Sequence, residues 1–500
     1  GGNAFDAAVA TAATLNVVEP YMSGMGGVGS LLAHIGKENR TRVLNFTGHA
    51  PGNADSSLFT DENKERGILS VLVPGSVSGW LTLHQDYGIL EREEIFKYAI
   101  EYAEEGFPLT RLNNFLISDS RARWSPYSSS RTILEPYGTV PRSGEILRQQ
   151  QLADSLRKVS KGGAEVFYKG EIGQQLIKAS KEMGGLLREE DLNNYQAWWE
   201  DPISITYRDY EIFTPPPNSD GFQLLQTLKL MELYLPNELG YGESDTLHRT
   251  IEATKLAITD RIRYAGDPNF TVIPLETLLS RKYASNQRLR IRDIASTVQG
   301  ERYNPQSPTN SMVPGKMDPS LLGSTTHLAV ADRDGNIVTL TQSLGSGFGS
   351  GIAIGETGIF LNNVANWFDL ALPGNTSNII GPNRLVEWCP TPSHTLKDGK
   401  FVLSIGTPGG YGIAQTTTQM LMHFIDFDMD IQQAIEAPRF KITSGRSVEM
   451  ESRFSNNVHS DLINKGHIVD VIEPWSRGVG GAQGIMIDKE SGAFNGGADP

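Results

Sequence analysis

The sequence has almost no cysteine, no long apolar run and no excess of positive charge. Cys389 is the one cysteine among 500 residues, which excludes an intrachain disulfide and any zinc site built from cysteines. No run of about 18 apolar residues is present, so the sequence predicts no membrane-spanning helix. Lys and Arg number 44 against 58 Asp and Glu, a formal net charge of −14. This balance argues against a nucleic-acid partner and suits a protein that handles small molecules.

Helical and strand-like segments alternate along the chain and predict an α+β fold in packed layers. The segments with helical patterning are Asn3–Val18, Arg92–Glu105, Gln150–Val159, Glu171–Met183, Ser244–Tyr264 and Ile413–Asp426. The segments with strand patterning are Ser30–Ile35, Thr326–Ala331, Ile337–Thr341, Gly358–Leu361, Phe401–Ile405 and Gly484–Ile487. Residues 302–322 are rich in Pro, Ser, Asn and Gly, the composition of an exposed, flexible loop.

The sequence gives little support for three common functional motifs: a dinucleotide-binding loop, a histidine metal site and a lipase-type serine triad. Gly24-x-Gly26-x-x-Gly29 matches the dinucleotide-binding pattern, but it follows a helix and precedes a strand, the reverse of what that motif requires. A tight structural loop is the favoured interpretation. The nine histidines include no HExxH motif and no pair four residues apart, so a metal site of neighbouring histidines is not supported. Without a Gly-x-Ser-x-Gly elbow, a lipase-type serine triad has little support.

The strongest candidate site is Gly323-Ser324-Thr325-Thr326-His327, where the loop meets a strand. One interpretation is simply a strand that begins with β-branched residues. The other is an N-terminal nucleophile: cleavage before Thr325 would free an α-amine that can act as the base for the hydroxyl of the same residue. His327 is interpreted as structural rather than catalytic.

Two further segments bear on this nucleophile hypothesis. A two-residue turn at Asp334-Gly335 would place Thr326 opposite Ser343, with Thr325 one step further along, within reach of the Ser343 hydroxyl. Gly409 and Gly410 follow a strand-like run and could present two backbone N–H groups as an oxyanion hole. A simple turn is the alternative interpretation of these glycines.

Taken together, these segments resemble the γ-glutamyltranspeptidase (γ-glutamyltransferase) family. The matching pieces, in chain order, are Gly1–Val9, Val18–Pro20, Ser23–Gly27, Val73–Gly75, Pro215–Gly221, Thr325–His327, Gly335-Asn336, Gly355-Glu356, Asn362-Asn363, Gly381–Asn383, Pro408–Gly410 and Ala437–Arg439. They run through nearly the whole chain, and their order and spacing make a chance match improbable.

The resemblance implies an Ntn-hydrolase with an αββα four-layer sandwich and self-cleavage between Ser324 and Thr325. Residues 1–324 would become a large subunit and residues 325–500 a small one, the two forming one intertwined domain. Thr325 would be the nucleophile, and Ser343 stands where the family has a threonine that holds the nucleophile's amine. Gly409 and Gly410 would form the oxyanion hole. No cofactor and no metal are implied.

The chain departs from the family in the pocket that holds the γ-glutamyl group. Thr47 occupies the place of the arginine that binds the substrate α-carboxylate, and Gly345 that of an asparagine. Val364 and Trp367 replace the residues that bind the α-amino group, and Trp388 and Cys389 replace two serines. Thr47, Gly345, Trp367 and Trp388 are therefore the expected substrate contacts. Asn366, Asp369 and Arg384 lie close in sequence and could supply another polar anchor.

The sequence thus predicts a self-processing threonine amidohydrolase or acyltransferase that acts on a small amide, with water or an amine as acceptor. Two alternatives stay open: a true γ-glutamyltranspeptidase that hydrolyses glutathione, and a weakly catalytic binding protein on the same fold. Neither a nucleic acid nor a membrane is an expected partner, and a dimer of the processed subunits is left open. A cytoplasmic location is preferred, but a secreted or periplasmic one is not ruled out because a leader could precede Gly1.

Overall fold

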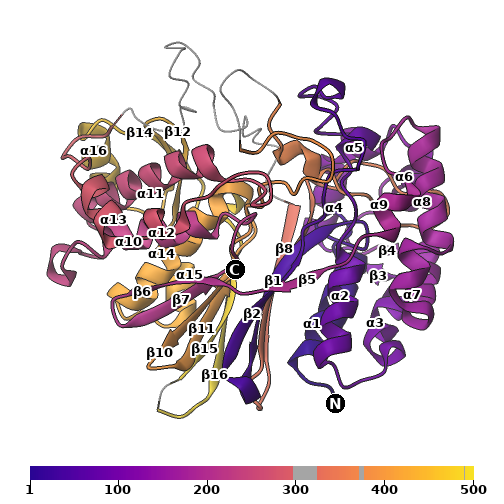
Figure 1. Ribbon diagram of the computed structural model, residues 1–500, viewed down its shortest axis with the longest axis horizontal. Coiled ribbons are helices and arrows are strands. Elements are labelled where there is room, and N and C mark those ends of the chain that lie inside the picture. Colours follow the sequence, from indigo (N-terminus) through magenta and orange to yellow (C-terminus); the bar gives the residue numbers. More distant parts are fainter. Residues whose placement is uncertain (297–323, 371–376, 489) are drawn as a thin grey trace. The chain divides into compact units, whose positions relative to one another are not determined.

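The computed structural model describes residues 1–296, 324–370, 377–488 and 490–500 (Figure 1). The predicted loop at 302–322 lies outside these residues. The chain divides into two compact units, each described below by itself. The first unit comprises Gly1–Glu200, Gly323–Ala371 and Ile379–Val386, and the second comprises Asp201–Leu322, Leu372–Asn378 and Glu387–Pro500. Each unit therefore combines segments from before and after the Ser324–Thr325 bond.

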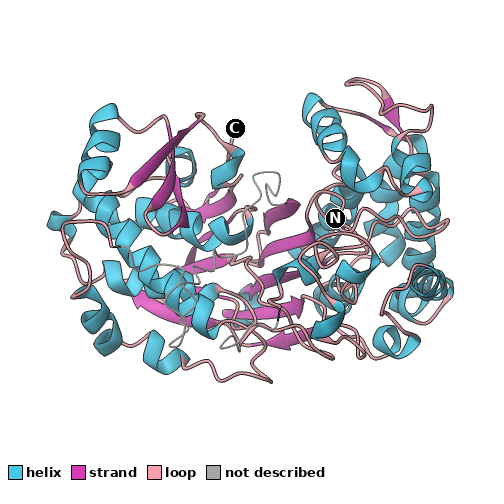
Figure 2. Ribbon diagram, turned by 90° about the horizontal axis from the view of Figure 1, so that it is seen from above, coloured by secondary structure: helices cyan, strands magenta, loops and turns pink. Residues whose placement is uncertain are grey.

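The first unit is built on a five-stranded antiparallel sheet of order β5-β2-β1-β9-β8. The strands are β1 (Val28–Ile35), β2 (Arg40–Phe46), β5 (Trp198–Glu200), β8 (Ser324–Ala331) and β9 (Ile337–Gly345). Helices α1 (Ala4–Val18) and α2 (Ser76–Tyr87) pack on this sheet, and α3 (Arg92–Glu105) and α7 (Gln150–Tyr168) lie behind them (Figures 1 and 2). The remaining elements of this unit are β3 (Phe107–Pro108), β4 (Ile146–Leu147), α4 (Arg111–Asp119), α5 (Arg121–Trp124), α6 (Ser128–Leu134), α8 (Glu171–Glu182) and α9 (Glu189–Asn193).

Helix α1 shows why this layer packs closely. Asn3 and Asp6 form a reciprocal capping box at its start, and it ends at Val18, two residues before Pro20. Its alanines are small enough to let the helix lie against β8 and β9. The loop that follows is tight, because a Cβ on Gly26 would meet the backbone oxygen of Phe360 at 2.1 Å.

The second unit has a six-stranded sheet of order β16-β15-β11-β10-β7-β6. Its strands are β6 (Ile203–Tyr207), β7 (Tyr210–Thr214), β10 (Ser393–Lys397), β11 (Lys400–Gly406), β15 (Gln483–Ile487) and β16 (Phe494–Ala498). Helices α10 (Gly221–Met231), α14 (Ile413–Asp426) and α15 (Ile431–Glu436) pack on it, and α11 (Ser244–Tyr264) packs on α10. The other elements are α12 (Leu275–Leu278), α13 (Arg281–Arg288), α16 (Asn456–Asn464) and the small sheet of β12 (Phe440–Ser444), β13 (Ser447–Glu451) and β14 (Ile468–Ile472).

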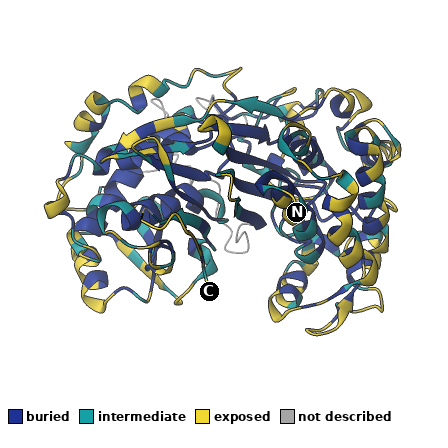
Figure 3. Cartoon of the chain, turned by 90° about the horizontal axis from the view of Figure 1, so that it is seen from below, coloured by how far each residue is buried: buried dark blue, intermediate teal, exposed yellow. Residues whose placement is uncertain are grey.

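The central strands of both sheets are buried, whereas exposed residues gather on the outer helices (Figure 3). The helices predicted at Arg92–Glu105, Ser244–Tyr264 and Ile413–Asp426 are confirmed with the same bounds. The prediction of a strand at Gly358–Leu361 is wrong. That segment makes single bridges, of Leu361 with Gly26 and of Phe360 with Ala353, instead of a continuous ladder.

Within the described part of the chain, no helix combines the length and the apolar character that crossing a membrane requires.

Candidate active site

The β8–β9 hairpin fixes where Thr325 lies relative to Ser343. The predicted register is wrong by one residue, because Thr325, not Thr326, lies opposite Ser343. The connection is longer than a two-residue turn: Asp332 N–H donates to Asn336, and Gly335 adopts a left-handed conformation with φ of 79°. A turn followed by a left-handed glycine adds one residue to a hairpin loop and shifts the pairing. The shift brings Thr325 into direct contact with Ser343.

Ser343 connects both sides of the Ser324–Thr325 peptide bond. The Thr325 hydroxyl donates to Ser343 Oγ at 3.1 Å, and the Ser343 hydroxyl donates to the Ser324 carbonyl oxygen at 2.8 Å. The backbone N–H of Gly345 donates to Ser343 Oγ at 2.8 Å and holds the side chain in place. All of these residues except Gly345 are buried. The hydroxyl of Thr325 and the carbonyl of Ser324 therefore share one hydrogen-bond partner.

The two residues after Thr325 are held by other buried partners. Thr326 accepts a hydrogen bond from Ser23 Oγ, which in turn accepts one from the Gln342 side chain. A ring nitrogen of His327 lies 2.8 Å from Thr341 Oγ1, and burial lowers the pKa of His327 to about 3. His327 is thus neutral and hydrogen-bonded to Thr341, which supports the interpretation that it is structural rather than catalytic.

Strand pairing places Thr325, Ser343 and Val28 in one row of the sheet. Thr325 pairs with Ser343, Ser343 pairs with Val28, and Gly29 pairs with Phe46. The β1–β2 pairing ends at Gly29 and Phe46, and Thr47 is the first residue after β2. Residues directly opposite one another in neighbouring strands point to the same face of a sheet, so the side chains of this row share one face.

Thr47 is tied into a polar network with Asn45 and Glu200. Its backbone N–H and its hydroxyl both donate to Asn45 Oδ1, at 3.1 and 2.9 Å. Asn45 Nδ2 donates to Glu200 Oε1 at 3.0 Å, and the Trp198 indole donates to the other Glu200 oxygen at 3.3 Å. Burial raises the pKa of Glu200 to about 7, although these two hydrogen bonds act in the opposite direction.

The structure leaves no room for a side chain at Gly345. Its φ of 101° is left-handed, and a Cβ there would meet Asn363 Oδ1 at 2.1 Å. Asn363 uses that oxygen to accept from Ser346 N–H and its amide to bind the Glu65 carbonyl oxygen. Gly345 can therefore meet a substrate only through its backbone.

Residues 364–367 form one turn of 3₁₀ helix in the first unit. Val364 is fully buried, and Trp367 is half-buried. Among the other expected anchors, Asn366 and Asp369 are half-buried, and Arg384 donates to the Ile379 carbonyl oxygen at 3.2 Å.

Trp388, Cys389, Gly409 and Gly410 belong to the second unit. Trp388 is fully buried and exchanges backbone hydrogen bonds with Asn218 and Asp220. Gly409 and Gly410 have φ of 139° and 56°, conformations that favour glycine. Within the described residues, neither N–H group of this pair donates to another protein atom, and both residues are half-buried. The turn thus presents two backbone N–H groups that donate to no other described protein atom.

Sequence reasoning missed a buried charged cluster in the second unit. Arg261 of α11 binds Glu387, lies 3.6 Å from Asp220 and stacks on the Tyr411 ring with 4.1 Å between the guanidinium carbon and the ring centroid. Burial and the neighbouring Glu387 raise the pKa of Asp220 well above its ordinary value. Glu387 precedes Trp388 and Tyr411 follows Gly410, so Arg261 connects the two segments that carry the expected site residues.

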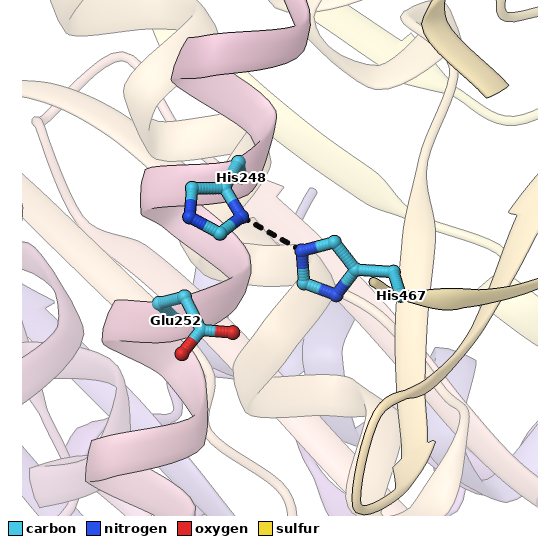
Figure 4. A group of neighbouring side chains, drawn as sticks. All are labelled: His248, Glu252 and His467. Carbon is cyan, nitrogen blue, oxygen red and sulfur yellow. Dashed lines mark hydrogen bonds between the residues drawn. The ribbon is translucent and has the colours of Figure 1, made fainter. Parts of the chain in front are cut away.

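A second missed cluster could in principle hold a metal ion. His248 and Glu252 lie one turn apart on α11, and His467 reaches them from the residue before β14 (Figure 4). His248 Nδ1 and His467 Nε2 are 2.8 Å apart, and His248 Nε2 lies 2.6 Å from the Arg292 carbonyl oxygen. However, the buried Lys255 ammonium already binds Glu252 at 2.6 Å and Ser296 O at 2.7 Å. The cluster therefore works as a hydrogen-bond network that anchors residues 292–296. The His248-x-x-x-Glu252 spacing was the available sequence signal.

The whole chain, residues 1–500, matches the family model described as gamma-glutamyltranspeptidase. The chain belongs to the γ-glutamyltranspeptidase family. It is 33% identical over 521 residues to the glutathione hydrolase proenzyme of Escherichia coli (strain K12), covering 100% of this chain and 87% of that protein. It is 34% identical over 484 residues to the acylase ACY 1 proenzyme of Pseudomonas sp. (strain SE83), covering 94% and 83%.

A solved structure of cephalosporin acylase from Bacillus halodurans is similar over the whole chain. Its TM-score is 0.90 at 32% identity, covering 100% of this chain and 90% of that one. The fold is therefore the α+β Ntn-hydrolase fold, and the protein is an enzyme of the amidohydrolase and acyltransferase type found in this family.

Proposed function

We propose that the chain cleaves itself between Ser324 and Thr325 and then hydrolyses small, non-glutamyl amides through Thr325. The observation that carries this proposal is the position of Ser343, which accepts from the Thr325 hydroxyl and donates to the Ser324 carbonyl oxygen. That arrangement suits proton transfer during an attack of Thr325 Oγ on the Ser324 carbonyl carbon.

In the cleavage step, Thr325 Oγ bonds to the Ser324 carbonyl carbon while its proton passes to Ser343. The Ser343 proton passes to the carbonyl oxygen, which becomes a hydroxyl group as the neutral tetrahedral intermediate forms. The C–N bond then breaks as the proton of this hydroxyl group passes to the Thr325 nitrogen, and an ester joins Ser324 to Thr325. Water hydrolyses this ester, which leaves a carboxylate on Ser324 and a free α-amine on Thr325.

In the amide reaction, the α-amine of Thr325 takes the proton from Thr325 Oγ as that oxygen attacks the substrate carbonyl. The Gly409 and Gly410 N–H groups stabilise the resulting oxyanion. The leaving amine departs with the proton, and water hydrolyses the threonyl ester. Ser343, released from Ser324, is then free to orient the α-amine.

The proposal of a non-glutamyl acyl group rests on the residues at the positions where the family binds the γ-glutamyl group. A γ-glutamyl group carries a carboxylate and an ammonium, which both need charged or polar partners when they leave water. Thr47, Val364 and Trp367 offer neither a cation nor a carboxylate. The relatives include proteins named acylases as well as glutathione hydrolases, so both substrate classes occur among similar chains.

Gel electrophoresis and an amide screen test the proposal. Purified protein should give chains of 324 and 500 − 324 = 176 residues, and Thr325→Ala should stay uncut. The processed protein should release p-nitroaniline from non-glutamyl acyl anilides. If Thr325→Ala is still cut at this bond, the nucleophile is misassigned. If the processed protein cleaves no amide, it is a binding protein instead.

A further inference from the structure

A chain of buried hydrogen bonds runs from helix α2 to Thr326, the residue after the nucleophile. The Trp80 indole donates to Gln342 Oε1 at 2.8 Å, and Gln342 Nε2 donates to Ser23 Oγ at 3.0 Å. The Ser23 hydroxyl in turn donates to Thr326 Oγ1 at 3.1 Å. All four side chains are buried, so these bonds form away from water.

The first two bonds of this chain have one possible direction. An indole nitrogen can only donate, so Gln342 must present its amide oxygen to Trp80 and its NH₂ group to Ser23. The same NH₂ group also donates to the Ala12 carbonyl oxygen of α1 at 3.2 Å, which requires the same orientation of the amide. Ser23 Oγ thus accepts from Gln342, and the hydrogen of Ser23 serves the bond to Thr326. The chain therefore holds Thr326 from the loop between α1 and β1.

Cleavage before Thr325 would turn the start of β8 into a chain terminus. Among the described residues, β8 is an edge strand that pairs with β9 on one side. Before cleavage, the Thr325 nitrogen is bonded to Ser324, whose carbonyl oxygen accepts from Ser343. Cleavage removes this attachment. Terminal residues are poorly ordered unless further contacts hold them, so the new terminus needs an anchor.

Thr326 is placed to provide this anchor. Successive side chains of a strand point to opposite faces of the sheet, so Thr325 meets Ser343 on one face while Thr326 meets Ser23 on the other. The bond from Ser23 adds a side-chain contact to the backbone pairing of β8 with β9. A reacting group has to be held within about 0.5 Å of its productive geometry, and a contact one residue away restricts the backbone of Thr325 directly.

We propose that Ser23, Gln342 and Trp80 anchor the N-terminus that cleavage creates, and thereby hold Thr325 in position for the amide reaction. They are positioning residues that act through Thr326. This inference rests on the proposed function and concerns the same site. It separates the two reactions of Thr325, because self-cleavage takes place while Ser324 still holds the residue, whereas turnover of a substrate depends on the anchor.

Ser23→Ala removes the donor to Thr326 and tests the anchor in both reactions. Self-cleavage of the full chain, followed on gels, should keep the wild-type rate. The processed variant should lose roughly 10- to 100-fold in kcat for an uncharged acyl p-nitroanilide, with KM little changed, because a misplacement of 1 Å can cost about 10² in rate. A role in stability alone would not separate the two reactions in this way.

Ser155→Ala on α7 is the matched control. The buried Ser155 hydroxyl donates to the Thr357 carbonyl oxygen at 2.8 Å, so this variant also loses one buried hydrogen bond, and it should keep both rates. Thr326→Val removes the acceptor but keeps the shape of the side chain, and it should lower kcat as Ser23→Ala does. The double variant should lose no more than either single variant, because both changes remove the same bond.

An aminopeptidase tests the anchor without the amide reaction. Release of Thr325 from the small subunit, followed by mass spectrometry, should be roughly tenfold faster in Ser23→Ala than in wild type or Ser155→Ala, because a frayed terminus is more accessible to a protease. If the wild type is cut but cleaves no amide, the proposed function fails, and this comparison alone decides on the anchor.

Three results would overturn the inference. Processed Ser23→Ala could keep the wild-type kcat, it could keep the wild-type resistance to the aminopeptidase, or its self-cleavage and turnover could fall by the same factor. If Ser23→Ala does not fold, Thr326→Val decides by the same measurements.

Discussion

At the scale of single residues, Ser343 is the most important residue of the cleavage site, because its hydroxyl contacts both reacting groups. Ser343→Ala should slow self-cleavage and lower kcat by roughly 10²–10⁴, the usual range for acid–base assistance. Time courses on gels and steady-state kinetics of the processed fraction measure the two effects separately. Ser343→Thr keeps the hydroxyl and should retain most of both activities. A rise in KM with kcat unchanged would assign Ser343 to substrate binding instead.

The raised pKa of Glu200 predicts that the free energy of unfolding depends on pH. Its pKa is raised from 4.5 to about 7 by burial, so the folded state binds a proton more tightly than the unfolded state. The contribution of Glu200 to the free energy of unfolding is therefore largest below about pH 4.5, and it is lost as the pH rises to about 7. Glu200→Gln does not titrate, so its Tm relative to wild type should increase between pH 5 and pH 8. Calorimetry measures this, and Glu93→Gln, at an exposed position, is the control. A constant Tm difference would contradict the raised pKa.

At the scale of elements, helix α11 connects two loops through one buried cation. Arg261→Met removes the positive charge beside Glu387 and Asp220 and leaves both acids buried without it. Losing one partner of a buried ion pair typically costs about 3–5 kcal/mol of unfolding free energy. Denaturant unfolding should show a loss of this size. Arg263→Met, at an exposed position two residues along the same helix, should change stability by less than about 0.5 kcal/mol. Equal losses in the two variants would show that the cluster does not contribute.

The hairpin shows how far sequence patterns determine an element. Alternation predicted both of its strands, and these are confirmed within longer bounds. The register could not be derived, because Asp334-Gly335 is compatible with either a two-residue or a longer loop. Only the left-handed Gly335 and the bond from Asp332 to Asn336 decide between them. One residue of shift decides whether Thr325 or Thr326 faces Ser343.

At the scale of the whole molecule, we predict that the processed enzyme is a poor γ-glutamyltransferase. Removing an arginine that pairs with a buried carboxylate costs on the order of 2–5 kcal/mol of binding. Hydrolysis of γ-glutamyl-p-nitroanilide should therefore be slow, with little transfer to glycylglycine. Thr47→Arg should raise kcat/KM for this substrate relative to an uncharged acyl anilide. Turnover like that of a dedicated transpeptidase, with a micromolar KM, would mean that other residues bind the glutamyl group.

The sequence by itself determined the family, the nucleophile candidate and the main helices, because these depend on local motifs and on the periodicity of apolar residues along the chain. The tertiary structure alone decided which side chains meet. Val28, Ser343 and Thr325 share a row because three strands pair in one register. Glu200 reaches Asn45, and His467 reaches His248, from positions 155 and 219 residues away in the chain. No local pattern records such contacts, since they arise from packing between distant segments.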